Sequence, residues 1–232
     1  MSSQVSPIIL ALDTQDITKA KEWIRGTNKT IKFFKVGLEF YLTHGSQGIA
    51  ELREEGDFSL FLDLKLHDIP NTVAAATSAV SEISPRFLTV HASGGQDMIR
   101  AAATAAPMID ITAVTILTSL SNQALEEIGF QDGALESAVR LAKLSILAGA
   151  RAIVTSPLEV QAIREAIGPD ATIITPGVRP TGSAMGDQTR VMTPKDAIEA
   201  GSTYLVIGRP ITSLVTPELM GEKAREITDS IY

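Results

Sequence analysis

Short apolar segments recur along the chain, and polar residues and glycines separate them. Within each segment the hydrophobic residues follow one another instead of alternating with polar ones. This pattern is typical of parallel strands that are covered on both faces. It predicts eight β-strands, at residues 7–13, 31–37, 59–65, 86–91, 109–117, 151–156, 172–177 and 203–208.

Between these segments the apolar residues take a helical spacing. Ile17, Ala20 and Ile24 would share one face of a helix, because positions three and four apart are neighbours on its surface. The longest gap, between the fifth and sixth strands, has room for two helices at about residues 122–128 and 134–148. The predicted chain therefore alternates strands with helices from end to end.

Eight strand–helix units in 232 residues predict an α/β fold, the (β/α)8 or TIM barrel. We expect a single domain over residues 1–232, with residues 1–6 as a loose N-terminal extension. A doubly wound open sheet is the rival architecture. It normally has a glycine-rich turn after its first strand, and residues 11–16, ALDTQD, contain no glycine.

Composition narrows the classes of function. Hydrophobic residues make up 44% of the chain, enough for a sizeable core. The net charge of −7 offers no basic field for nucleic acid or an anionic membrane, and the absence of cysteine excludes disulfides and thiolate chemistry. The first residues do not resemble a signal peptide and no apolar run has membrane-spanning length, so we expect a cytoplasmic protein.

Charged residues stand at the ends of the predicted strands, where barrels carry their catalytic side chains. Asp63 and Lys65 are two positions apart, so their side chains share one face and point into the barrel mouth. Lys35, at the end of the neighbouring strand, can reach the same mouth. A structural salt bridge is the alternative interpretation. A network of alternating charges can stay ionised where a lone buried charge cannot, and it leaves a lysine able to donate a proton.

Residues 63–72, DLKLHDIPNT, resemble the signature D-x-K-x-x-D-I-P-x-T of the orotidine 5′-phosphate decarboxylase family, in its bacterial form. Other stretches resemble this family in the same order along nearly the whole chain. They are ALD at 11–13, KVG at 35–37, LTS at 117–119, TPGVRP at 175–180, GDQTRVMTP at 186–194 and VIGRPI at 206–211.

The resemblance implies decarboxylation of orotidine 5′-monophosphate to uridine 5′-monophosphate, the last step of de novo pyrimidine biosynthesis. It implies that no metal, thiamine or pyridoxal cofactor is needed. Lys65 would protonate ring carbon 6 and stabilise the negative charge that develops there. Asp63 would lie beside the leaving carboxylate, and Lys35 together with Asp63 would hold Lys65 cationic and correctly aimed.

The resemblance also implies a homodimer. Asp68 and Thr72, beyond the third strand, would cross the interface into the partner's site. Asp68 would then be the fourth member of an array with Lys35, Asp63 and Lys65. A solvated loop aspartate is the alternative for Asp68.

Two further residues would contact the nucleoside. Asp13 would bind the ribose hydroxyls, although it could instead cap the following helix. Thr118 would contact the pyrimidine amide, or be an ordinary strand-end hydroxyl.

The three histidines, His44, His67 and His91, show no metal-ligand spacing, and we expect structural or hydrogen-bonding roles for them.

Cationic residues and glycines follow the last two strands, where barrels commonly bind phosphate. Arg209 offers a planar fork for phosphate, and Gly208 lets backbone N–H groups approach it. Arg179 and Gln188 bracket residues 179–188, which we expect to form a mobile lid. A surface loop with an incidental arginine is the alternative, but cations that converge beside glycine in an acidic protein favour a phosphate site.

Three other functions share some of these sequence features. A sugar-phosphate decarboxylase of the same barrel suprafamily shares a similar D-x-K-x-x-D and uses Mg²⁺, but the IPNT and GDQTR stretches argue against it. A Schiff-base aldolase needs a neutral lysine, whereas flanking acids would keep Lys65 charged. A non-catalytic nucleotide-binding protein would bind ligand without releasing CO2.

Overall fold

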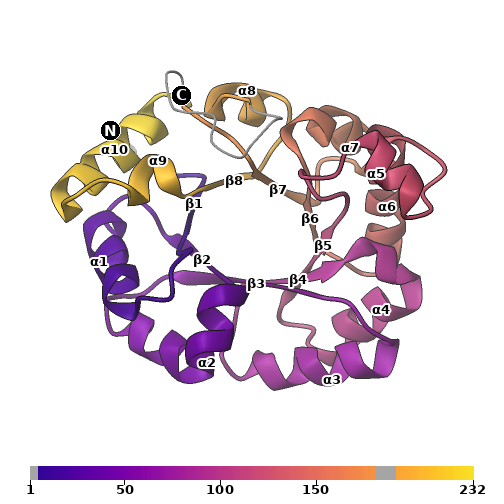
Figure 1. Ribbon diagram of the computed structural model, residues 1–232, viewed down its shortest axis with the longest axis horizontal. Coiled ribbons are helices and arrows are strands. Elements are labelled where there is room, and N and C mark those ends of the chain that lie inside the picture. Colours follow the sequence, from indigo (N-terminus) through magenta and orange to yellow (C-terminus); the bar gives the residue numbers. More distant parts are fainter. Residues whose placement is uncertain (1–4, 181–191) are drawn as a thin grey trace.

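The computed structural model describes residues 5–180 and 192–232 of the chain. Eight parallel strands pair in sequence order and close into a barrel, with helices around the outside (Figure 1). The strands are β1 (Ile8–Ala11), β2 (Phe33–Gly37), β3 (Ser59–Leu66), β4 (Phe87–His91), β5 (Asp110–Val114), β6 (Ala152–Val154), β7 (Thr172–Pro176) and β8 (Tyr204–Ile207). The predicted barrel is confirmed, and the open sheet is excluded because β8 pairs with β1.

Helices connect successive strands and cover the barrel. They are α1 (Ile17–Thr27), α2 (Leu38–Arg53), α3 (Pro70–Ser81), α4 (Gly95–Ala105), α5 (Asn122–Glu127), α6 (Ala134–Leu147), α7 (Val160–Ile167), α8 (Pro194–Glu199), α9 (Arg209–Thr212) and α10 (Pro217–Asp229), with short 3₁₀ turns η1 (Ala92–Gly94) and η2 (Pro157–Glu159). The two helices expected between the fifth and sixth strands are present as α5 and α6. The Asp16 side chain caps α1 by accepting hydrogen bonds from Thr18 N and Lys19 N.

The core has two layers. The larger layer lies between the strands and the surrounding helices. The smaller one fills the inside of the barrel, where Phe61 packs edge-on against Phe87 with ring centroids 5.8 Å apart. Phe33 and Tyr204 complete this interior aromatic group, with centroids 4.7 Å apart. These four rings, here called the aromatic floor, belong to the cluster that fills the barrel interior below the C-terminal ends of the strands.

Strand β3 departs from regular pairing where its charged residues begin. It pairs with β4 at Phe61↔Phe87 and Leu62↔Leu88, and pairing resumes only at Leu66↔Val90. Between these points β3 advances by four positions while β4 advances by two. Lys65 lies inside this bulge with a φ of 50°. The regular alternation assumed from the sequence is therefore wrong at Lys65, although its side chain still faces the barrel mouth.

The described part of the N-terminal segment is packed against the barrel. Ser6 is 2% exposed and its hydroxyl forms a 2.8 Å hydrogen bond with the hydroxyl of Thr228. A loose extension was expected over residues 1–6, but Ser6 is packed against the barrel. Residues 1–4 lie outside the described residues. No helix in the described ranges is long and apolar enough to cross a membrane.

Candidate active site

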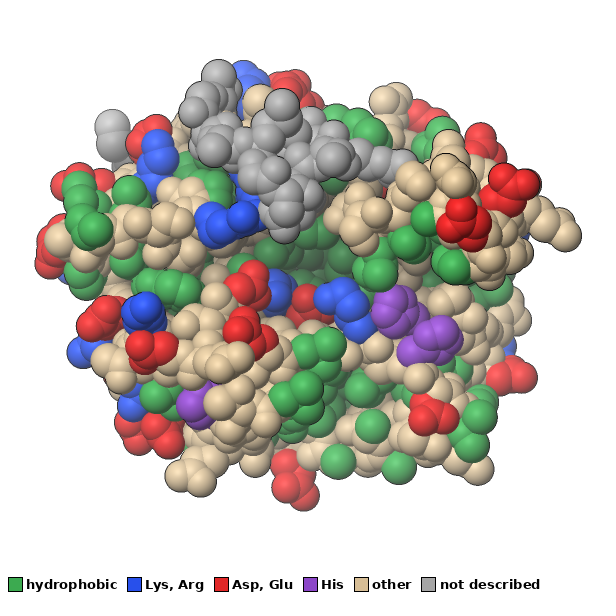
Figure 2. All heavy atoms as spheres, viewed as in Figure 1, with side chains coloured by type: hydrophobic (Ala, Val, Ile, Leu, Met, Phe, Trp, Pro, Cys, Tyr) green, Lys and Arg blue, Asp and Glu red, His purple; other side chains and the backbone are tan. Residues whose placement is uncertain are grey.

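A cavity of about 300 Å³ opens at the C-terminal ends of the strands. Every strand except β4 contributes lining residues, either from the strand itself or from the loop that follows it. Figure 2 shows this mouth as a hollow with acidic and basic side chains gathered along one side. The volume is at the lower end of the range for small-molecule sites, so the cavity suits a small ligand.

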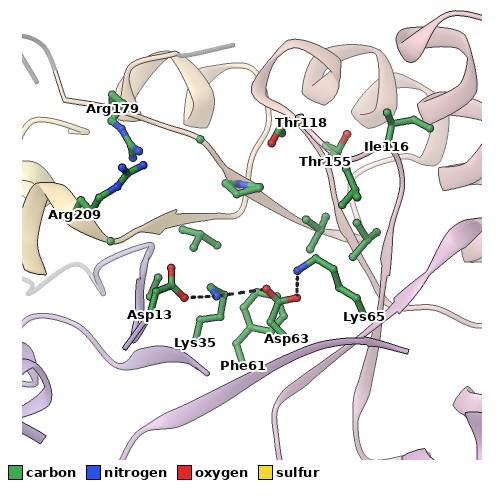
Figure 3. Close-up of a pocket in the computed structure, with 18 of the residues that line it drawn as sticks. Asp13, Lys35, Phe61, Asp63, Lys65, Ile116, Thr118, Thr155, Arg179 and Arg209 are labelled. Carbon is green, nitrogen blue, oxygen red and sulfur yellow. Dashed lines mark hydrogen bonds and ion pairs between the residues drawn. The ribbon is translucent and has the colours of Figure 1, made fainter. Parts of the chain in front are cut away.

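Four charged side chains form one wall of the cavity, and we call them the charge row. Lys35 Nζ lies 3.0 Å from Asp13 Oδ1 and 3.4 Å from Asp63 Oδ2. Lys65 Nζ lies 2.7 Å from Asp63 Oδ1. The signs thus alternate along Asp13, Lys35, Asp63 and Lys65 (Figure 3). Because Asp16 caps α1 and Asp13 binds Lys35, the helix-capping alternative for Asp13 is wrong.

The middle of the charge row is buried and ionised. Burial alone would raise the pKa of Asp63, but the neighbouring charges of Lys35 and Lys65 lower that pKa below its ordinary value. Burial alone would lower the pKa of Lys35, but Asp63 and Asp13 raise it above its ordinary value. Both side chains therefore carry their charges at neutral pH, and the alternation of sign is what permits this in a buried site.

Two small features of neighbouring strands hold the charge row in place. Gly37 ends β2 where an added Cβ would lie 3.3 Å from Lys35 Nζ, so the absence of a side chain leaves room for the ammonium. Thr89, on β4, accepts a hydrogen bond from Lys65 N at 2.8 Å and donates one to Asp63 Oδ1 at 3.0 Å. The sequence gives no signal for Thr89, which is an ordinary β-branched residue in an apolar strand.

Two arginines lie at the other end of the cavity. Arg179 follows β7 and Arg209 follows β8, and in Figure 3 their guanidinium groups approach each other across the cavity from the charge row. Gly208 and Thr118 also line the cavity, as the sequence predicts. Gln188, and with it most of the expected lid, lies outside the described residues.

Asp68 and Thr72 do not line the cavity of their own chain. Both are exposed, and Asp68 Oδ1 accepts a 2.6 Å hydrogen bond from Ile69 N. Within one described chain the expected array therefore contains Lys35, Asp63 and Lys65 but not Asp68. Its contribution from a partner subunit stays a prediction.

The histidines lie outside the cavity lining. His44 Nε2 donates a 2.7 Å hydrogen bond to the carbonyl oxygen of Gln15. His67 and His91 lie side by side near the mouth, with ring centroids 5.4 Å apart. Burial, together with the neighbouring His67 and Lys65, lowers the pKa of His91 below its ordinary value. Among residues 5–180 and 192–232, no cluster of three or more histidine or acidic side chains could hold a metal ion.

The fold and the site define a class: a (β/α)8 barrel with a cavity at the C-terminal ends of its strands, lined by a row of alternating charges and by two arginines. The chain belongs to the Orotidine 5′-phosphate decarboxylase / HUMPS family, whose model matches residues 6–224.

Individual relatives carry the decarboxylase name. The chain is 51% identical over 212 residues to the orotidine 5′-phosphate decarboxylase of Thermobifida fusca (strain YX), covering 91% of each chain. It is 46% identical to the enzyme of the same name from Moorella thermoacetica, covering 90% of this chain and 87% of that one. The crystal structure of the Lactobacillus acidophilus orotidine 5′-phosphate decarboxylase superposes with a TM-score of 0.83 at 34% identity, over 97% of this chain and 99% of that one.

Proposed function

We propose that the cavity binds orotidine 5′-monophosphate and that the chain releases its carboxylate as CO2, leaving uridine 5′-monophosphate. This is the reaction of the decarboxylases in the family to which the chain belongs. The observation that carries the proposal is one cavity with the charge row on one wall and Arg179 and Arg209 at the opposite end. A molecule with an anionic phosphate at one end and a reacting ring at the other matches that arrangement.

The ligand would lie with its phosphate against the arginines and its carboxylated ring carbon beside Lys65. Arg209 presents the planar fork that suits phosphate oxygens, and Arg179 adds a second positive charge. Asp13, 64% exposed at the edge of the charge row, would accept hydrogen bonds from the ribose hydroxyls. Thr118 would hydrogen-bond the pyrimidine amide. Gln188 is proposed to contact the phosphate on sequence grounds alone.

The chemistry needs a positive charge and a proton at one ring position. As the bond between carbon 6 and the carboxylate breaks, CO2 leaves and the electron pair stays on carbon 6. The Lys65 ammonium stabilises that negative charge and then donates its proton to carbon 6. Its amine regains a proton from water. Asp63 and Lys35 hold the ammonium in place beforehand, and such preorganised charge is usually the largest single contribution to catalysis.

Asp63 has a second proposed effect on the substrate. Placed beside the leaving carboxylate, its negative charge would repel the ground state. Two like charges ~4 Å apart repel by about 4 kcal/mol at an effective dielectric of ~20. Loss of the carboxylate as neutral CO2 removes this repulsion, so it favours the reaction in the same direction as Lys65.

A homodimer is also proposed, with Asp68 and Thr72 reaching the partner's cavity. Both stand on exposed surface beside Ile69, a large apolar side chain that is 65% exposed. A second copy that covers Ile69 would bring Asp68 close to a partner's lysines. Hybrids of Asp68→Ala and Lys65→Ala subunits should recover activity, because half of their sites then hold both residues. Hybrids as inactive as the parents would argue for self-contained subunits.

One assay tests the proposed reaction. The absorbance of orotidine 5′-monophosphate is followed with wild type and with Lys65→Ala, in chelator and without added metal. We expect rapid conversion by the wild type and almost none by the variant. Conversion that chelator abolishes would favour the Mg²⁺-dependent sugar-phosphate class. Binding without CO2 release would favour a nucleotide-binding protein. An active Lys65→Ala would refute the proposed proton donor.

A further inference from the structure

Thr89 lies behind the charge row, on the one strand that contributes nothing to the cavity lining. Its side chain is completely buried, and its hydroxyl lies between two members of the row. Lys65 N donates to Thr89 Oγ1 at 2.8 Å, and the same hydroxyl donates to Asp63 Oδ1 at 3.0 Å. That Asp63 oxygen also accepts the 2.7 Å bond from Lys65 Nζ. One hydroxyl thus contacts both the backbone of Lys65 and the carboxylate that holds its ammonium.

The bulge in β3 explains why a side chain is needed at this point. A residue other than glycine with a φ of 50° is uncommon, and such a conformation costs about 1–3 kcal/mol unless its surroundings stabilise it. The bulge also removes Lys65 N from the regular ladder between β3 and β4. A buried backbone N–H must find another acceptor. Thr89 Oγ1 is that acceptor. A side chain of β4 thus replaces the backbone carbonyl that the bulge has moved out of reach of Lys65 N.

We propose that Thr89 is a positioning residue for the reaction. Its hydroxyl fixes the left-handed turn at Lys65 and the orientation of Asp63, and so sets where the ammonium lies in the cavity. Thr89 does not contact the substrate. The inference rests on the roles proposed above for Asp63 and Lys65.

Threonine suits this place better than its nearest alternatives. Valine has the same shape but would leave Lys65 N without an acceptor and Asp63 without a donor. Serine keeps both hydrogen bonds but lacks the branched Cβ that restricts the side-chain rotamer. Removing the hydroxyl should therefore impair the reaction, whereas shortening the side chain to serine should largely preserve it.

The experiment compares kcat and KM in Thr89→Val, Thr89→Ala and Thr89→Ser. We expect kcat of the two hydroxyl-free variants to fall roughly 10- to 100-fold, the range for loss of a hydrogen bond to a charged group. KM should hardly change, because the phosphate contacts are untouched. Thr89→Ser should restore most of kcat. The acid limb of the pH profile should move to higher pH in Thr89→Val, because the hydrogen bond from Thr89 helps to lower the pKa of Asp63.

Thr112 provides the matched control. It is the register partner of Thr89 on β5 and is equally buried, but its hydroxyl donates only to the carbonyl oxygen of Asp110. Thr112→Val removes a hydroxyl at the same depth without touching the charge row. It should keep the wild-type kcat and the wild-type pH profile.

The outcomes separate this inference from the proposed function. Wild-type kcat in Thr89→Val and Thr89→Ala, beside an inactive Lys65→Ala, would overturn the positioning role alone. An equal loss in Thr112→Val would overturn it too, since core packing would then explain the effect. An active Lys65→Ala would instead overturn the proposed chemistry. If neither hydroxyl-free variant folds, hydrogen exchange of the wild type tests the proposal instead. The amide hydrogen of Lys65 should exchange slowly with solvent, and fast exchange would contradict the proposal.

Discussion

At one end of the cavity the first three strands hold four alternating charges, whereas at the other end the segments after β7 and β8 present two arginines. Lys35 and Asp63 are each 9% exposed and are joined by ion pairs within the chain. Arg209 is exposed at the start of the short helix α9. Arg179 precedes residues 181–191, which lie outside the described residues.

The two ends of the cavity therefore differ in how they depend on the folded chain. A buried charge is tolerated only with its partner, so the charge row must be assembled as the chain folds. Arg209 lies on the exposed side of the cavity, where it is proposed to bind the ligand phosphate. Substitutions in the charge row should therefore lower kcat and stability together. Substitutions at the arginine end should lower substrate binding and leave stability nearly unchanged.

Asp63→Asn should have the largest effect. It removes the negative charge between two lysines, and breaking a buried pair costs about 3–5 kcal/mol. If that cost falls on the transition state, kcat should drop roughly 10²- to 10⁴-fold. Steady-state kinetics and thermal unfolding of the same preparation provide the measurement. Asp97→Asn is the control, because its ion pair with Arg100 is exposed and contributes little. Equal losses of kcat and thermal stability in Asp63→Asn and Asp97→Asn would contradict the role proposed for the charge row.

Arg209→Ala should come next. We expect kcat/KM for the nucleotide to fall roughly 100- to 1000-fold, because each charged hydrogen bond contributes about 1.5–3 kcal/mol. The melting temperature should hardly move. The same variant assayed with orotidine, which lacks the phosphate, should differ little from the wild type. A similar loss with both substrates would show that Arg209 does not act through the phosphate.

Asp13→Asn should have a smaller effect, because Asp13 is the most exposed member of the charge row. Lys35 keeps its pair with Asp63 when Asp13 is neutral. We expect a loss of about tenfold in kcat/KM, the value of one good hydrogen bond to a ribose hydroxyl. A substrate without the 2′-hydroxyl should reduce this difference if Asp13 binds that group. A loss as large as that of Asp63→Asn would place Asp13 in the chemistry itself.

The pH dependence of stability should show the smallest effect. The pKa of Asp63 lies below its ordinary 3.8, because the attraction of Lys35 and Lys65 exceeds the effect of burial. Its contribution to stability is therefore present above that pH and is lost as pH falls toward the lowered pKa. The pKa of Lys35 lies above 10.5 despite burial, so its contribution is lost only as pH rises through the raised pKa.

Melting temperatures of the wild type and Asp63→Asn across this range check the sign. The difference between the two melting temperatures should be constant between the lowered pKa of Asp63 and the raised pKa of Lys35. It should shrink in strong acid. A difference that grows on acidification would mean that Asp63 is not held ionised in the folded protein.

Much of this architecture can be predicted from the sequence, because it depends on local patterns. Runs of apolar residues mark the eight strands, and apolar residues at helical spacing mark the helices between them. Thr193 and Thr216, each followed by a proline, cap α8 and α10, a combination typical of helix starts. The side chain of Asp63 faces the mouth, as its position in the strand predicts. Lys65 faces the mouth as well, although the bulge interrupts the regular alternation there.

What the sequence does not predict depends on contacts between distant segments. The bulge in β3 arises from its pairing with β4, and alternation along β3 alone gives no sign of it. Thr89 acquires its hydrogen bonds only through that bulge. The trans role proposed for Asp68 depends on a second chain.

The aromatic floor governs how the reaction products leave. Phe61 lines the cavity, and behind it Phe87, Phe33 and Tyr204 fill the barrel interior. Among the described residues these rings fill the barrel below the cavity, so carbon dioxide released beside Lys65, as proposed, would leave through the same mouth as the nucleotide. Anything that covers this mouth during the reaction would then delay the release of both products.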